Sequence, residues 1–195
     1  MGRAKRIDVG GGLYHVTARG NDRCRIVLDD ADRLRWLTLR ARCDESYQWK
    51  CHAWCLLTTH FHLLIETLEA NLAEGMHWLN HVYAKTFNGR HEREDHVFGK
   101  RYGAKLITSD DQLVAVVRYI ALNPVKAGLV DEPAAWPWCN YGDLSRLALG
   151  EAGSPPGRYG ELLAQGARLA QQTAADPNGR GRSRRVPVPG TVEEG

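Results

Sequence analysis

Two apolar runs separated by only two residues constrain the fold of this chain more than any other feature. Residues 50–57 and 60–66 have the composition of β-strands, and Thr58 and Thr59 lie between them. A two-residue connection fits a tight hairpin, which joins neighbouring strands in antiparallel directions. Threonine is not the glycine or asparagine that such turns prefer, yet the spacing still favours a largely antiparallel sheet.

The segments before this hairpin are predicted from their periodicity. Alternation over residues 12–19 predicts a strand, in which one face carries Leu13, His15, Thr17 and Arg19. Residues 30–46 read as a helix, because apolar side chains recur at spacings of three and four. The expected buried positions of this helix are Leu34, Leu37 and Ala41.

Two further helices and one strand follow the hairpin. Asn71 with Glu74 predicts a capping box for a helix whose buried stripe is Leu72, Met76, Leu79, Tyr83 and Phe87. A strand is expected at about 103–108. Ser109 with Gln112 is a second capping box, and it opens a helix that we expect to end near Asn123, because Pro124 disfavours helical geometry in the residue before it.

The order of these elements predicts an α+β fold, with helices packed on an antiparallel sheet in a ferredoxin-like or RRM-like arrangement. We expect one main domain over residues 1–145, onto which Trp136, Trp138 and Tyr141 tuck an irregular segment. Residues 146–172 are expected to form a helical extension, with a helix at 158–172. Residues 173–195 are rich in Pro, Gly, Arg and Ser and are expected to be a disordered basic tail.

Charge is concentrated near the ends of the chain. The net charge of the 195 residues is only +3, but Arg3, Lys5 and Arg6 open the sequence, Arg19, Arg23 and Arg25 follow, and Arg180, Arg182, Arg184 and Arg185 lie near the end. Basic clusters around a balanced middle are common in proteins that bind nucleic acids. Solvated charges without a partner are the alternative interpretation.

The sequence also suggests where the protein works. The N-terminus lacks a signal-peptide pattern, and no apolar run is long enough to span a bilayer. The five cysteines form no tight framework, so reduced thiols are expected. We therefore expect a cytoplasmic, nucleoid-associated protein.

His60 and His62 are the most unusual residues of the hairpin. Side chains alternate along a strand, so both imidazoles point to one face, about 7 Å apart, while Phe61 points to the other. Two neutral imidazoles at this spacing can bind one divalent ion. Two ordinary histidines on a half-exposed face are the simpler alternative.

Tyr119 and Asn123 share a face of the helix that follows, because they are four residues apart. Tyr119 lies roughly 110° from the centre of the helix's apolar stripe, at its rim, where a phenol can face a cleft. An amide oxygen beside two imidazoles would make an open ligand set, and a tyrosine is an oxygen nucleophile suited to attack phosphorus. A tyrosine reaching into water and an asparagine at a helix end are the alternatives.

Several motifs together resemble one known family. "YHVTARGN", "CHAWCLLTTHFHLL", "FGKRYGAKLI", "RYIALNPVKAGLV" and "WPWCNY" are similar, in order and spacing from about residue 10 to 145, to the REP-associated tyrosine transposases. These belong to the single-tyrosine transposases that carry a His-hydrophobic-His (HUH) motif. The resemblance implies that the main domain is an HUH transposase domain and that its fold is an antiparallel sheet with helices.

The resemblance also implies a site. His60 and His62 match the metal-binding pair, Asn123 lies where the group carries a Gln or Asn that completes the metal site, and the metal is Mg²⁺ or Mn²⁺. Tyr119 matches the nucleophile that keeps the 5′ end of single-stranded DNA as phosphotyrosine, beside a hairpin such as a REP element. We expect Arg3, Lys5, Arg6, Arg19, Arg23 and Arg101 to contact this DNA. Monomers and homodimers both occur among relatives, so the oligomeric state stays open.

This chain departs from the family pattern at two places. Thr58-Thr59 stands where many relatives carry Pro-Asn or Pro-Asp, and "FGKRY" replaces "FQGRY". Neither change removes a predicted catalytic group.

Three alternatives compete with this interpretation. A zinc site could use Cys51, Cys55, His52 and the histidine pair, but strand alternation puts the two cysteines on one face and His52 on the other. Tyr102 could be the nucleophile, although its place just before a strand favours a structural or DNA-contacting role. Finally, the chain could be a domesticated protein that binds structured single-stranded DNA or RNA without cutting it.

Overall fold

A computed structural model describes residues 8–148 and 159–175 of the chain. Its centre is a four-stranded antiparallel sheet in the order β2-β3-β1-β4. The strands are β1 (Leu13–Arg19), β2 (Trp49–Leu56), β3 (His60–Thr67) and β4 (Gly103–Leu106). The predicted α+β fold, ferredoxin-like in element and strand order, is confirmed.

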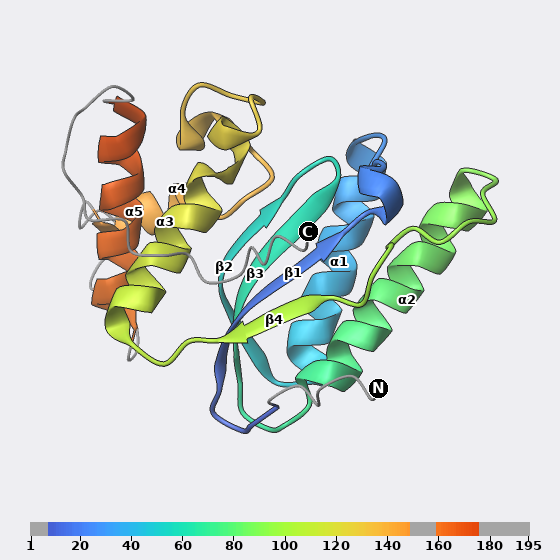
Figure 1. The fold of residues 1–195 in the computed structure, drawn as a ribbon, viewed down its shortest axis with the longest axis horizontal. Coiled ribbons are helices and arrows are strands. Elements are labelled where there is room, and N and C mark those ends of the chain that lie inside the picture. Colours follow the sequence, from blue (N-terminus) through green and yellow to red (C-terminus); the bar gives the residue numbers. More distant parts are fainter. Residues whose placement is uncertain (1–7, 149–158, 176–195) are drawn as a thin grey trace, which may run out of the picture.

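Helices cover both faces of this sheet (Figure 1). The helices α1 (Asp30–Ser46) and α2 (Leu72–Arg90) lie on one face. On the other lie α3 (Asp110–Lys126), α4 (Tyr141–Ala148) and α5 (Gly160–Ala175). Two short 3-10 helices, η1 (Asn21–Arg23) and η2 (Pro133–Ala135), lie in the connections. No helix in the described parts is long and apolar enough to cross a membrane.

Each central strand contributes to two cores, because its side chains alternate between the faces. Phe61, Leu63 and Ile65 of β3 pack under α1 and α2, whereas Leu64 packs with α3 and α5. The predicted stripe of α2 is buried at all five positions. His60 and His62 share the parity of Leu64, so they face α3.

The structure corrects the buried face of α1 but not its bounds. Leu34 is 58% exposed, and Ala41 is also exposed. Trp36, Leu39 and Cys43 are buried instead. The Trp36 ring lies 4.9 Å from the Phe61 ring, centroid to centroid, and burying this large indole outweighs burying a leucine.

The capping box predicted at Asn71 and Glu74 is wrong. Asn71 precedes α2, but its side-chain oxygen accepts a hydrogen bond from Trp49 Nε1 at 2.7 Å rather than from the helix. The Asp8 carboxylate accepts hydrogen bonds from the first two backbone N–H groups of α2, at 3.2 and 3.1 Å. At α3 the predicted cap is present, since Ser109 Oγ accepts from the Gln112 backbone N–H at 3.3 Å.

Pro124 does not stop α3, contrary to the prediction. The helix runs on to Lys126 with a buried Pro124 inside it. A proline there removes one backbone donor, and the turn is held by the Ala127 N–H, which donates to the Asn123 carbonyl at 2.9 Å. Asn123 is therefore inside the helix and not an end residue.

A β-bulge in β2 corrects the predicted faces of its cysteines. The register against β3 shifts between Cys51 and Ala53. As a result Cys51 packs on the α1–α2 side of the sheet, whereas Cys55 is buried on the α3 side. The expectation that the two cysteines share a face was based on uninterrupted alternation, and a bulge breaks that alternation.

The segment after α3 docks on the sheet as predicted. Trp136 Nε1 donates to the Leu56 carbonyl at 3.1 Å, and the Leu56 N–H donates to the Trp138 carbonyl at 2.9 Å. Tyr141 is buried against α5. The helix expected at 158–172 is α5, which continues to Ala175, and residues 176–195 lie outside the described part.

Candidate active site

His60 and His62 lie at the start of β3, one of the two central strands. His62 is 4% exposed and His60 is half-buried. Their ring centroids are 5.1 Å apart and the rings are nearly perpendicular, at 82°. The strand pairs on both sides, with β1 and β2, so the sheet holds the backbone of the two histidines in place.

Each of these imidazoles uses its Nδ1 atom for a local contact. His60 Nδ1 lies 3.0 Å from Thr59 Oγ1, and His62 Nδ1 lies 3.1 Å from Nε2 of His15. His62 Nε2 is fully buried and has no hydrogen-bond partner within the described residues. A buried nitrogen without a partner is costly and calls for a ligand.

His15 is a member of this cluster that the sequence interpretation did not single out. Its ring stacks on His62, with centroids 5.3 Å apart and an interplanar angle of 21°. A signal was present, because alternation put His15 on the same face of β1 as Thr17, which pairs with His62 across the sheet.

The helix α3 places Tyr119 and Asn123 over the histidines. The Tyr119 ring lies edge-on to His62, at 5.3 Å and 87°, and 5.8 Å from the His15 ring. Asn123 is 6% exposed, and its amide Nδ2 donates to the Tyr119 carbonyl at 3.3 Å. The four side chains predicted to meet therefore lie together. Their roles as ligands and nucleophile stay predictions.

Burial keeps the three imidazoles uncharged at neutral pH. It lowers the pKa of His15 to about 4, with Lys105 adding to the effect. Burial and then Arg19 lower the pKa of His60 to about 4. The pKa of His62 is lowered well below its usual value, again mainly by burial. Asn123 opposes this by raising the pKa of His60 and His62, although it forms no aligned hydrogen bond to Nε2 of His62.

This donor set fits an open metal site. Metal ions bind neutral imidazole through a ring nitrogen that carries a lone pair. The buried Nε2 atom of His62 forms no hydrogen bond within the described residues, so it is free to act as such a ligand. No group of three His, Cys, Asp or Glu side chains in residues 8–148 and 159–175 is arranged to hold a metal ion. Protein ligands here would be two imidazoles and the Asn123 amide, which leaves coordination positions for phosphate and water.

A basic cleft lies next to His60. Arg19 ends β1 directly opposite His60 in the sheet register. Arg19, Arg23, Lys100 and Arg101 line a cleft of about 400 Å³. Three of the arginines predicted to contact DNA are thus gathered at one place, while Arg3, Lys5 and Arg6 lie outside the described residues.

The backbone around this cleft is unusual. Asp22 and Arg23 both have positive φ, 47° and 59°, in the left-handed region that non-glycine residues rarely adopt. Gly20 is required before them, because a Cβ atom there would lie 2.1 Å from the Cys24 carbonyl oxygen. Such local strain is often found at functional sites.

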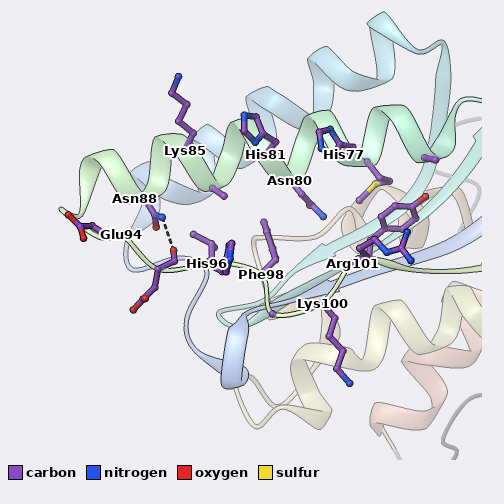
Figure 2. A pocket seen from close by; sticks show the side chains of 17 residues that line it. His77, Asn80, His81, Lys85, Asn88, Glu94, His96, Phe98, Lys100 and Arg101 are labelled. Atoms are coloured by element: carbon purple, nitrogen blue, oxygen red, sulfur yellow. Dashed lines mark hydrogen bonds between the residues drawn. The ribbon is translucent and has the colours of Figure 1, made fainter. Parts of the chain in front are cut away.

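A second groove lies on the opposite side of the sheet. Figure 2 shows it between α2, which carries His77, His81 and Lys85, and the segment that leads to Lys100 and Arg101. Tyr102 lines this groove and is only 5% exposed, within the core under α2. The sheet therefore separates Tyr102 from the histidines, which argues against it as the nucleophile.

The alternative zinc site does not assemble. Cys51 and Cys55 lie on opposite faces of the sheet because of the bulge. His52 Nε2 instead lies 3.1 Å from Glu66 Oε2.

The fold and the site together define the class of protein. A histidine pair, an asparagine and a tyrosine lie on one face of a ferredoxin-like sheet, beside an arginine-lined cleft, and this arrangement fits the transposases that the sequence resembles. The sequence comparison agrees: residues 9–123, more than half of the chain, match the family described as "Transposase IS200 like". The chain belongs to this family.

Two relatives make the resemblance more specific. The chain is 28% identical over 152 residues, 72% of its length and 86% of the relative's, to a protein of Haemophilus influenzae (strain ATCC 51907 / DSM 11121 / KW20 / Rd) that is provisionally named as a REP-associated tyrosine transposase. Its fold is similar to the solved structure of a REP-associated tyrosine transposase bound to a REP hairpin. That match has a TM-score of 0.62 at 20% identity and covers 73% of this chain and 84% of the other.

Proposed function

We propose that this chain cuts and rejoins single-stranded DNA beside a hairpin, with Tyr119 as the nucleophile and with Mg²⁺ or Mn²⁺ held by His60, His62 and Asn123. One observation carries the proposal: the Tyr119 ring packs edge-on against the buried His62 ring at 5.3 Å, and Asn123 lies one helical turn further along α3, hydrogen-bonded to the Tyr119 carbonyl. Apolar side chains would pack a contact between a strand and a helix equally well. A phenol, two neutral imidazoles and an amide are instead the groups that suit phosphoryl transfer.

The reaction is a transesterification. The Tyr119 hydroxyl oxygen attacks a DNA phosphorus, the bond from phosphorus to the 3′ oxygen breaks, and the phenol proton is lost as the 3′ hydroxyl gains one. The 5′ end stays on the enzyme as phosphotyrosine, which keeps the energy of the broken phosphodiester, so a 3′ hydroxyl can reverse the step and join strands. A metal ion held by His60, His62 and Asn123 would supply positive charge to polarise the phosphate.

Lys126 and Arg19 are placed to assist this reaction. The Lys126 ammonium lies 4.9 Å from the centre of the Tyr119 ring, where it favours the negative charge that develops on the attacking oxygen. Arg19 and the cleft beside it offer a path for the DNA backbone. The relative bound to a REP hairpin supports a hairpin-flanked substrate for this chain.

The test uses the full chain with an end-labelled oligonucleotide that contains a hairpin and a single-stranded flank. We expect a covalent protein–DNA adduct on a denaturing gel with Mn²⁺ or Mg²⁺, and none with EDTA or with Tyr119→Phe. Tyr102→Phe is the matched control and should still form the adduct. An adduct that survives in Tyr119→Phe but disappears in Tyr102→Phe would overturn the assignment. Tight, salt-sensitive binding without any adduct would favour a binding protein.

A further inference from the structure

His15 has no part in the proposed chemistry, yet it lies in the middle of the cluster. It stands on β1, where it pairs with Leu64 on one side and with Lys105 of β4 on the other. Its Nε2 atom is 3.1 Å from Nδ1 of His62, and the two rings stack. A histidine that is mostly buried and paired with another histidine needs a reason, because each ring could otherwise be apolar.

The contact between the two rings can hold only one proton when both are neutral. If His62 donates from Nδ1, then His15 Nε2 accepts and His62 Nε2 carries a lone pair. If His15 donates instead, His62 Nε2 carries a proton that forms no aligned hydrogen bond among the described residues, although the Asn123 amide is near the ring. Only the first arrangement gives the buried nitrogen a chemical use, because a metal ligand must offer a lone pair.

His60 shows the same pattern with a different partner. Its Nδ1 atom lies 3.0 Å from Thr59 Oγ1, which leaves Nε2 as the remaining ring nitrogen. Thr59 is one of the two turn residues at which this chain departs from the family pattern. Both histidines therefore have Nδ1 engaged within the protein.

We propose that His15 is a positioning residue that accepts the Nδ1 proton of His62 and so presents the Nε2 lone pair of His62 to the metal. This inference rests on the proposed metal site but not on the tyrosine chemistry. A hydrogen-bond partner behind a ligating histidine fixes its tautomer and ring orientation, and its loss typically weakens metal binding about 10–100-fold.

The first measurement reads the tautomer directly. Long-range ¹H–¹⁵N NMR spectra of the metal-free, ¹⁵N-histidine-labelled full chain should show His62 protonated at Nδ1 and unprotonated at Nε2. A His62 ring protonated at Nε2 overturns the proposal. This readout does not depend on DNA cleavage.

The second measurement compares two variants by Mn²⁺ electron paramagnetic resonance. His15→Phe keeps a stacked ring but has no acceptor, and the Mn²⁺ dissociation constant should rise about 10–100-fold. His15→Gln offers an amide oxygen about where Nε2 lies and should stay within about threefold of the parent. The exposed His96, which lines the groove across the sheet, gives the matched control His96→Phe, with unchanged affinity expected.

The outcomes separate the two proposals. Parent-like Mn²⁺ affinity in His15→Phe, or an equal loss in His15→Gln, overturns the role of His15. Weakened binding in His15→Phe that His15→Gln restores supports it, even if the parent forms no DNA adduct. Absence of the adduct with Mn²⁺ binding intact would refute the proposed function alone.

Discussion

Replacing His62 by leucine separates its functional role from a structural one. His62 is 4% exposed, and its neutral ring leaves Nε2 buried without a partner. An unsatisfied buried polar atom costs about 1–3 kcal/mol, whereas the single hydrogen bond to His15 contributes about 0.5–1.5 kcal/mol. Leucine removes both and keeps most of the buried volume, but it also leaves His15 Nε2 without its partner, which costs about 1–3 kcal/mol. Because the two orphan terms nearly cancel, the metal-free variant should stay within about 1 kcal/mol of the parent.

This expectation is unusual, because substitutions of buried residues normally destabilise. Urea unfolding followed by circular dichroism in EDTA gives the free energy from the midpoint and slope. Leu64→Ala is the matched control, since Leu64 is fully buried on the same face of β3, and it should lose about 2–5 kcal/mol. A loss of 2 kcal/mol or more in metal-free His62→Leu would refute the reasoning and make His62 an ordinary core residue.

Metal should separate the stabilities of the two proteins. A ligand at 100 times its dissociation constant stabilises the folded state by about 2.7 kcal/mol. Saturating Mn²⁺ should therefore raise the unfolding midpoint of the parent but leave that of His62→Leu unchanged. An equal shift in both proteins would place the bound metal elsewhere.

Three further predictions concern stability and DNA binding. Asp8→Ala removes the cap of α2 and should lower the unfolding free energy by about 1 kcal/mol in urea titrations, with less loss in Asp8→Asn. Burial raises the pKa of Asp44 to about 6, although Arg40 opposes the effect. The folded protein therefore binds this proton more tightly than the unfolded chain does, and its stability falls as pH rises from about 4 to about 6. Asp44→Asn should gain on the parent by up to about 2–3 kcal/mol across that range, as pH-dependent urea titrations would show. Arg23→Gln and Arg101→Gln should each reduce the slope of log affinity against log salt by about one in fluorescence anisotropy with hairpin DNA.

Local patterns were enough to predict the four strands and the helices α1, α2, α3 and α5, but not the short helix α4, where an irregular segment was expected. The bounds of α1 match the prediction, β2 is shifted by one residue at both ends, and β3 extends one residue further than predicted. These features depend on periodicity within a few turns or a single strand. The buried face of α1 could not be predicted in this way. The choice between Leu34 and Trp36 depends on which side chain packs against Phe61 of the sheet.

Features that depend on distant residues could not be predicted in this way. The cap of α2 comes from Asp8, more than sixty residues earlier in the chain, and it outcompetes the local candidate Asn71. The bulge at Cys51 appears only in the register of β2 against β3. Similarly, Pro124 was read as a stop signal, but tertiary packing of α3 outweighs the loss of one backbone donor.

The candidate site shows the same division. His60, His62, Tyr119 and Asn123 are visible because each pair sits at a spacing that defines a shared face. His15 belongs to another strand, and its place beside His62 follows from the strand order β2-β3-β1-β4. The sequence pattern of each strand does not reveal this strand order unless a topology is assumed first.

The C-terminal helix explains how Tyr119 reaches histidines of its own chain. Gly166 of α5 lies so close to α3 that a Cβ atom there would come within 2.6 Å of Val117. Arg118, next to the tyrosine, donates to Thr173 Oγ1 at 2.8 Å. α5 thus holds α3 at the two residues that precede the proposed nucleophile. His60, His62, Tyr119 and Asn123 therefore lie together within one copy of the chain.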